Sequence, residues 1–212
     1  MNPRTRVKIC GITRPEDGVA AAALGVDAIG LVFYTKSPRY IEIEAARAVC
    51  AALPGFVTAV SLFMDPDAAL VNQVLDAIPV DLIQFHGKES ADFCRSFNRP
   101  YIKALGMADQ IDLTTKAAPY QDARGLLLDS HAPGAAGGTG AAFDWNSIPQ
   151  DFRRRIILAG GLNPDNIAAA IQQVRPYAVD LSSGVESAPG IKDVARMTRL
   201  MNEVKRVDCE TL

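Results

Sequence analysis

The chain has 212 residues, of which 49% are hydrophobic and 22% are charged, as in an ordinary soluble globular protein. Its formal net charge of −2 and its isoelectric point near 5.7 argue against a general affinity for nucleic acid or anionic membranes. No apolar run approaches the ~20 residues that a membrane-spanning helix needs, and the N-terminus lacks an apolar signal core. We therefore expect a cytoplasmic protein.

The candidate strands and helices alternate along the whole chain. In chain order, the strands are expected at "RVKICGI", "DAIGLVFY", "VTAVSLFM", "VDLIQFH", "PYIKALGM", "RGLLLDS", "RIILAGG" and "YAVDLSSG". Each of these runs is mostly apolar and does not alternate with polar residues, which is typical of parallel strands that are covered on both faces.

The segments between the strands carry helical periodicity of unequal strength. A polar capping residue or an early proline marks helix starts in "TRPEDGVAAAALG", "DPDAALVNQVLDAI", "NPDNIAAAIQQV" and "IKDVARMTRLMNEVKRV". The fifth and sixth segments, "DQIDLTTKAAPYQDA" and "FDWNSIPQDFRR", are short or interrupted by proline, so we expect single turns or irregular connections there. Eight strand–helix units without a linker predict a single (β/α)8 TIM barrel domain over residues 1–212.

The four cysteines, Cys10, Cys50, Cys94 and Cys209, form neither a CxxC pair nor a Cys/His cluster with the spacing of zinc ligands. We therefore expect neither disulfides nor a metal site. Cys50 and Cys94 stand in helical patterns, where a small buried side chain is the simplest interpretation. Cys10 ends an apolar strand and precedes glycine, so it is a buried structural residue, half of a disulfide, or a reactive thiol at a site.

Active sites of (β/α)8 barrels lie at the C-terminal ends of the strands. At those ends stand Cys10, Arg39 in "YTKSPRY", Gln84 and His86 in "IQFHG", and Asp129 in "LLLDS". These residues supply a thiol, a guanidinium and a carboxyl group. Arg39 is either a bidentate partner for a carboxylate or a solvated charge, and His86 either lines the pocket or supports another residue.

Two small turns follow the seventh and eighth strands. Gly160 and Gly161 end the seventh strand, and Ser182, Ser183 and Gly184 end the eighth. Glycine is needed where backbone N–H groups turn closely toward an anion, and barrels commonly hold a phosphate between these two loops. Either turn alone is routine, but together they predict a phosphate site.

Asp129 follows the apolar run "GLLL", which would desolvate its carboxyl group and raise its pKa, as a general acid needs. A loop-capping role is the alternative, because Asp-Ser pairs often cap loops. The loop over residues 131–145 has about fifteen residues without periodicity, and loops of that length are usually functional.

Several of these segments together resemble one known family. "VKICGIT", "GLVFY" with "SPR", "QFHG", "LLLDS" with "GGTGAAFDW", "LAGGLNPDNIAAA" and "VDLSSGVESAPGIKD" are similar, in order and spacing, to the phosphoribosylanthranilate isomerases of tryptophan biosynthesis. The resemblance covers nearly the whole chain. It implies conversion of N-(5-phosphoribosyl)anthranilate into 1-(2-carboxyphenylamino)-1-deoxyribulose 5-phosphate by an Amadori rearrangement, without a cofactor.

The resemblance also implies roles for single residues. Asp129 is expected to be the general acid that opens the sugar ring, and Cys10 the general base that removes the C2 proton. Arg39 is expected near the anthranilate carboxylate, with Gln84 and His86 lining the substrate site. The 5-phosphate is expected at the turns after the seventh and eighth strands.

Two other functions remain as alternatives. One is a related sugar-phosphate barrel, such as an Amadori isomerase of histidine biosynthesis, and the other is a catalytically silent phosphate-binding barrel. Histidine-pathway barrels use an aspartate as the first-strand base, so Cys10 argues against them. A silent binder would be expected to have lost Cys10 or Asp129. The expected partner is a small phosphosugar that carries anthranilate, with no nucleic acid or membrane, and the chain is a monomer or a homodimer.

Overall fold

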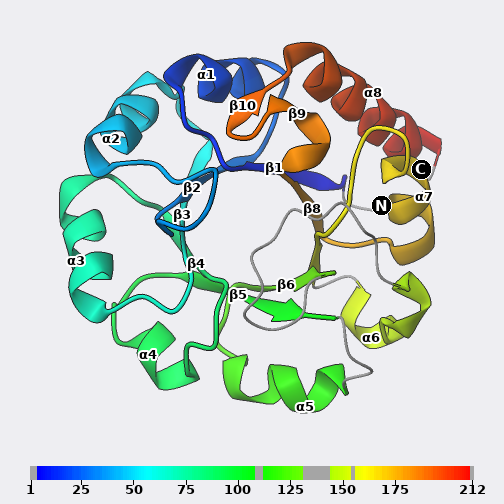
Figure 1. Ribbon diagram of the computed structural model, residues 1–212. Helices are drawn as coiled ribbons and strands as arrows, with labels where there is room; N and C mark the ends of the chain where they lie inside the picture. Colours follow the sequence, from blue (N-terminus) through cyan, green and yellow to red (C-terminus); the bar gives the residue numbers. More distant parts are fainter. Residues whose placement is uncertain (1–3, 108–111, 131–143, 154–155, 211–212) are drawn as a thin grey trace.

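The protein is described here by a computed structural model that covers residues 4–107, 112–130, 144–153 and 156–210. Eight parallel strands close into a barrel in chain order, with a ring of helices outside them (Figure 1). The strands are β1 (Arg6–Cys10), β2 (Ala28–Val32), β3 (Thr58–Phe63), β4 (Leu82–Phe85), β5 (Tyr101–Gly106), β6 (Gly125–Asp129), β7 (Ile156–Leu158) and β8 (Ala178–Leu181). The predicted (β/α)8 barrel is confirmed, whereas the single domain over residues 1–212 stays a prediction.

A helix follows each strand of the barrel. The helices are α1 (Pro15–Ala23), α2 (Ile43–Ala52), α3 (Ala68–Ala77), α4 (Ala91–Arg95), α5 (Leu113–Ala117), α6 (Gln150–Arg153), α7 (Ile167–Val174) and α8 (Val194–Glu210). As predicted, the fifth and sixth helices are short, with 5 and 4 residues. A 3-10 turn lies beside each of them, at Ala118–Tyr120 and Trp145–Ser147.

A small antiparallel hairpin lies between the last strand and the last helix. It consists of β9 (Glu186–Ala188) and β10 (Ile191–Lys192), and Gly190 turns between them with a φ of 79°. Sequence reasoning missed this hairpin, because strands of three and two residues are too short to produce a periodic pattern.

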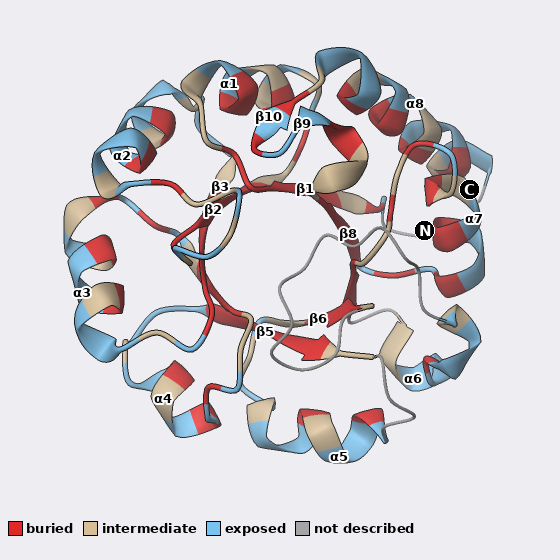
Figure 2. Ribbon diagram, viewed as in Figure 1, coloured by how far each residue is buried: buried red, intermediate tan, exposed pale blue. Residues whose placement is uncertain are grey.

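The main hydrophobic core fills the layer between strands and helices. Figure 2 shows the barrel strands buried and the helices buried on their inner sides. In β1, Val7 and Ile9 belong to this core, whereas Lys8 and Cys10 point into the barrel, because successive side chains of a strand face opposite sides. The two apolar faces explain why the strands read as continuous apolar runs.

The interior of the barrel is layered. One apolar cluster inside it consists of Ile102, Ala104, Leu127, Ile157, Ala159 and Ala178. A second cluster holds Cys10 beside Val32 and Leu62, which are the last residue of β2 and the next-to-last residue of β3. Cys10 is therefore packed among apolar side chains near the C-terminal ends of the strands.

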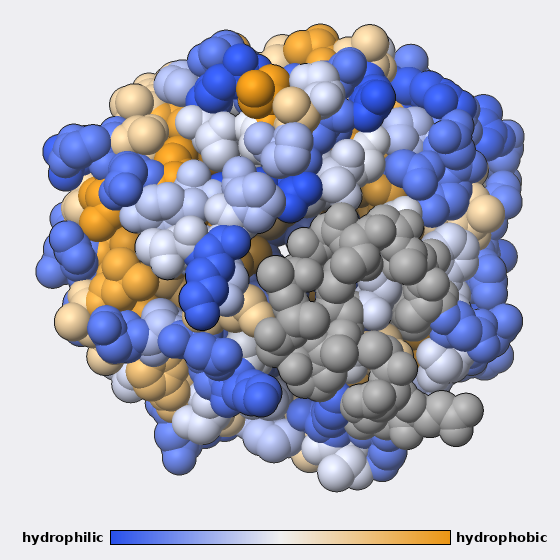
Figure 3. Space-filling view, in the orientation of Figure 1, coloured by the Kyte–Doolittle hydropathy of each residue, from blue (hydrophilic) through white to orange (hydrophobic). Residues whose placement is uncertain are grey.

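The last helix, α8, is amphipathic. Its inner face buries Met197, Leu200, Met201, Val204 and Val207. Hydrophilic residues cover the outer rim of the molecule over α8 in Figure 3. Among the described residues, no helix is both long and apolar enough to cross a membrane.

A buried ion pair ties together the loops after β3 and β4. The Nζ of Lys103 lies 2.7 Å from Glu89 Oε2 and 2.6 Å from the carbonyl oxygen of Gly87. Glu89 also accepts hydrogen bonds from the backbone N–H groups of Asp65 and Gly87. Each side chain of the pair is 2% exposed, so water cannot solvate either charge if the other one is removed.

We expect Lys103→Met to destabilise the barrel by about 3–5 kcal/mol, because removing one partner leaves a buried carboxylate uncompensated. Lys88→Met is the matched control, since Lys88 is exposed in the same loop and its loss should change stability by less than about 0.5 kcal/mol. Urea unfolding of the parent and both variants measures the difference. Similar small effects of the two substitutions would contradict a stabilising role for the pair.

Candidate active site

A pocket lies at the C-terminal ends of the barrel strands. Among the described residues, it is lined by all the predicted site residues except Gly184: Cys10, Arg39, Gln84, His86, Asp129, Gly160, Gly161, Ser182 and Ser183. The pocket is also lined by Asp180, which sequence reasoning did not single out. The strand ends therefore bring together side chains that are far apart in the sequence.

Cys10 is the last residue of β1, and its thiol is free and buried. Gly30 stands beside it on β2, where an added Cβ would lie 2.7 Å from Cys10 Sγ, so glycine leaves the space that the sulfur occupies. Burial raises the pKa of Cys10, although Lys8 and Lys192 oppose that rise. The disulfide interpretation is excluded, and the thiol faces the pocket.

For Cys50 and Cys94, the structure supports the interpretation as small structural residues. Burial raises the pKa of Cys50 to about 11 and that of Cys94 to about 12. Neither of these residues lines the pocket. At these pKa values very little of either thiol is thiolate at neutral pH, and the thiolate is the reactive form of cysteine.

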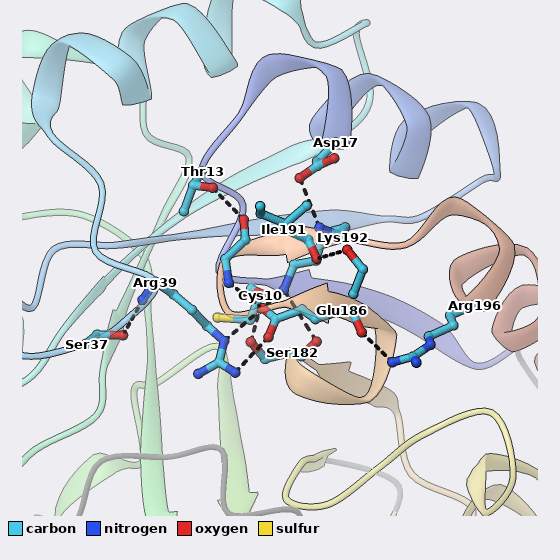
Figure 4. A network of polar contacts seen from close by, with 12 residues as sticks. Cys10, Thr13, Asp17, Ser37, Arg39, Ser182, Glu186, Ile191, Lys192 and Arg196 are labelled. Atoms are coloured by element: carbon cyan, nitrogen blue, oxygen red, sulfur yellow. Dashed lines mark hydrogen bonds and ion pairs between the residues drawn. The ribbon is translucent and has the colours of Figure 1, made fainter.

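Arg39 is held by a bidentate ion pair with Glu186. Its Nε donates to Glu186 Oε1 at 2.9 Å and its Nη2 donates to Oε2 at 2.8 Å (Figure 4). The aliphatic part of Arg39 lies over Gly11, where an added Cβ would come 2.6 Å from Arg39 Cδ. Its side chain is 11% exposed, so the alternative of a solvated loop charge is wrong.

Glu186 lies at the start of β9 and joins Arg39 to a second cation. The Nζ of Lys192 on β10 donates to Glu186 Oε1 at 2.7 Å, and the Lys192 side chain is fully buried. Burial alone would raise the pKa of Glu186, but hydrogen bonds from Arg39 and Lys192 outweigh burial and lower it. The hairpin therefore carries a carboxylate that fixes the position of Arg39 at the pocket.

Gln84, His86 and Asp129 form a chain of polar contacts across the barrel. The side-chain nitrogen of Gln84 lies 3.0 Å from His86 Nδ1, and His86 Nε2 lies 3.4 Å from Asp129 Oδ2. Gln84 is fully buried on β4, which restricts how the imidazole can turn. Of the two interpretations of His86, the structure supports both, since it lines the pocket and contacts Asp129.

The turn after β7 depends on glycine. Gly160 and Gly161 have φ angles of 84° and 65°, in the region that side chains disfavour. A Cβ on Gly160 would also approach the backbone nitrogen of Ser130 to 2.5 Å. The tight turn therefore brings the strand ends of β6 and β7 together.

The turn after β8 is anchored to β1, because Ser182 Oγ donates to the carbonyl oxygen of Cys10 at 3.0 Å. Ser183 then begins a 3-10 turn, Ser183–Val185. Gly184 does not line the pocket but packs against the loop after β7, where a Cβ would overlap the backbone oxygen of Leu162. Its contribution to a phosphate site stays a prediction.

Sequence reasoning missed four charged residues: Lys8, Asp180, Glu186 and Lys192. Each is buried, and each lies within or beside a segment of the recognised pattern. For Lys8 and Asp180, a charged residue within an apolar strand was the available signal, but the partner lies on another strand and could not be deduced. Most of the predicted functional loop, residues 131–143, lies outside the described residues.

The family model described as "N-(5'phosphoribosyl)anthranilate (PRA) isomerase" matches residues 7–203. The chain belongs to this family. An N-(5'-phosphoribosyl)anthranilate isomerase from Pseudomonas fluorescens is 55% identical over 204 residues, which are 96% of this chain and 97% of that protein. Family membership confirms the resemblance seen in the sequence motifs.

Solved structures of the family have the same fold. Phosphoribosyl anthranilate isomerase from Thermus thermophilus superimposes with a TM-score of 0.85 and 37% identity, over 96% of this chain and 100% of that chain. Another isomerase of the family, solved in complex with reduced 1-(o-carboxyphenylamino)-1-deoxyribulose 5-phosphate, has a TM-score of 0.83 and 38% identity. That match covers 95% of this chain and 99% of the other.

Gly30→Ala should disturb the pocket, because the new methyl group would lie 2.7 Å from Cys10 Sγ and 3.1 Å from Lys8 Nζ. We expect a loss of about 1–3 kcal/mol in unfolding free energy, typical of an overpacked core, and slower alkylation of Cys10. Gly55→Ala is the control, since nothing lies within 4 Å of its Cβ position. Unfolding curves that agree for the two variants would contradict this packing.

Proposed function

We propose that the chain isomerises N-(5'-phosphoribosyl)anthranilate to 1-(2-carboxyphenylamino)-1-deoxyribulose 5-phosphate, with Asp129 as the acid and Cys10 as the base. The observation that carries this assignment is the position of these two residues. They line one pocket from strands that are not neighbours, β6 and β1. An acid and a base on different sides of a substrate suit a reaction that protonates one atom and deprotonates another.

In the first step, Asp129 donates its proton to the ring oxygen of the ribose. The C1–O bond breaks, the nitrogen lone pair forms a C=N bond, and the ring opens to a protonated Schiff base. The carboxyl group of Asp129 is buried, and His86 Nε2 lies 3.4 Å from it. A group with restricted water access can direct its proton to one substrate atom.

In the second step, Cys10 as thiolate removes the proton from C2. The electrons of the C–H bond form a C1=C2 bond, and the C=N electrons return to nitrogen, which gives an enolamine. Tautomerisation then places a proton on C1 and leaves a ketone at C2. C2 is oxidised and C1 is reduced, so the rearrangement balances within the substrate.

The remaining pocket groups suit the two anionic parts of this substrate. Arg39 is fixed by Glu186 at the pocket wall, where a guanidinium can attract the anthranilate carboxylate. The backbone turns after β7 and β8 supply N–H groups for the 5-phosphate, and α7 begins shortly after the first turn. The cytoplasmic location and the choice between monomer and homodimer stay predictions.

Cys10→Ala and Asp129→Asn should each reduce kcat/KM by about 10² to 10⁴, the usual contribution of general acid or base catalysis. A continuous fluorescence assay of freshly prepared phosphoribosylanthranilate, coupled to the next enzyme that uses the product, measures turnover. Cys50→Ala is the matched control, because this cysteine lies on α2 outside the pocket and should leave turnover unchanged.

Thermal unfolding of the same variants separates catalysis from folding. Active-site substitutions should leave the melting temperature close to that of the parent. Absence of turnover by the well-folded parent would overturn the proposed function. Full activity of Cys10→Ala would overturn the assignment of the base.

A further inference from the structure

A second buried ion pair lies inside the barrel, immediately below the thiol of Cys10. Lys8 and Asp180 are register partners on the adjacent strands β1 and β8. The ammonium of Lys8 donates to both carboxylate oxygens of Asp180, at 2.9 Å each. The two side chains are only 6% and 7% exposed. Both charges are therefore held in place and largely hidden from water.

Lys8 and Cys10 point to the same side of β1, because they are two residues apart on one strand. Gly30 on β2 shows how close their end groups are. A Cβ there would lie 2.7 Å from Cys10 Sγ and 3.1 Å from Lys8 Nζ. Because Gly30 has no side chain, the Lys8 ammonium and the Cys10 sulfur both lie next to the same small space.

The charges around the thiol compete. Burial is the largest effect on Cys10 and raises its pKa, while the nearby positive charge of Lys8 lowers it. Burial alone would lower the pKa of Lys8. The interactions with Asp180 and Cys10 outweigh burial and raise it. Lys8 therefore stays an ammonium at neutral pH. Of the two lysines that lower the pKa of Cys10, Lys8 has the larger effect.

Titratable groups face Cys10 from several elements. The loop after β2 contributes Tyr34 and Arg39, and the hairpin contributes Glu186 and Lys192. The strands contribute Lys8, Asp129 and Asp180, and the loop after β4 contributes His86. Of these, Lys192 also lowers the pKa of Cys10, and Asp180 raises it. The net effect of the Lys8–Asp180 pair favours the thiolate, because the nearer ammonium has the larger influence.

The fold does not require a charged pair at this position. The next layer of the barrel interior is apolar, and replacing a buried ion pair by apolar residues of similar volume is often neutral or stabilising. Buried charges beside a candidate nucleophile or base are a common feature of functional sites. The pair is therefore better explained by its effect on Cys10 than by stability.

We propose that Lys8, held by Asp180, is a positioning residue that stabilises the thiolate of Cys10 for the abstraction of the C2 proton. This inference rests on the proposed function, in which Cys10 is the base. When the thiolate takes the proton from C2, Lys8 keeps all three of its own protons and loses only an electrostatic partner. Asp180 then remains as the counter-ion of Lys8, so the ammonium does not move toward the substrate.

The test is the pH dependence of Cys10 alkylation, since only the thiolate reacts rapidly. Parent protein and Lys8→Met are treated with iodoacetamide over a pH range of roughly 7 to 11, and mass spectrometry of the Cys10 peptide gives the rate. Lys8→Met should move the midpoint to higher pH and lower the rate at neutral pH about tenfold or more, since one pH unit is a tenfold change in thiolate. An unchanged midpoint overturns the inference.

A charge-neutral double variant covers the case in which Lys8→Met does not fold. Lys8→Met with Asp180→Asn removes both charges and leaves no buried carboxylate, and circular dichroism verifies its fold. The double variant should still show a midpoint above that of the parent. A folded double variant with the parental midpoint would mean that the pair is structural only.

Turnover separates this inference from the proposed function. Lys8→Met should lower kcat about 10²-fold, comparable to the loss of one charge-stabilising donor, with little change in KM because Lys8 does not line the pocket. A parent that lacks turnover refutes the proposed function, whatever the alkylation shows. A parent that turns over while Lys8→Met keeps the parental alkylation profile and kcat refutes only the role of Lys8.

Discussion

The closure of the sheet between β1 and β8 is the constraint on which the site depends. It sets Lys8 beside Asp180 and allows Ser182 to donate to the backbone of Cys10. Strand side chains alternate between two faces, so a shift of one residue would turn Lys8 and Cys10 into the layer beneath the helices. The register of one strand pair therefore decides whether the thiol faces the pocket.

Buried charges at the C-terminal ends of the strands are matched by partners on other elements. Glu89 pairs with Lys103, Glu186 pairs with Arg39 and Lys192, and Asp180 pairs with Lys8. A buried ion is tolerated only when a counter-charge and hydrogen bonds replace water. Two of these ion pairs also bear on the proposed function. Glu186 fixes Arg39, which is proposed to bind the substrate carboxylate, and Asp180 holds Lys8 beside Cys10, the proposed base.

The fold was predictable because its signals are local. Apolar runs such as "VTAVSLF" and helix caps such as Asp67, which accepts a hydrogen bond from the N–H of Leu70, need no distant partner. The weak helices were recognised for the same reason. The hairpin β9–β10 escaped detection because it is too short for periodicity, and it carries Glu186, which decides the environment of Arg39.

The sequence by itself determined the class of fold, the family and the residues at the strand ends, because these follow from periodicity and from motifs in order along the chain. Only the tertiary structure decided which charges meet. Arg39 is fixed by a carboxylate 147 residues away, and Lys8 by one 172 residues away. Such pairs depend on the closure and register of the barrel, and no local pattern records them.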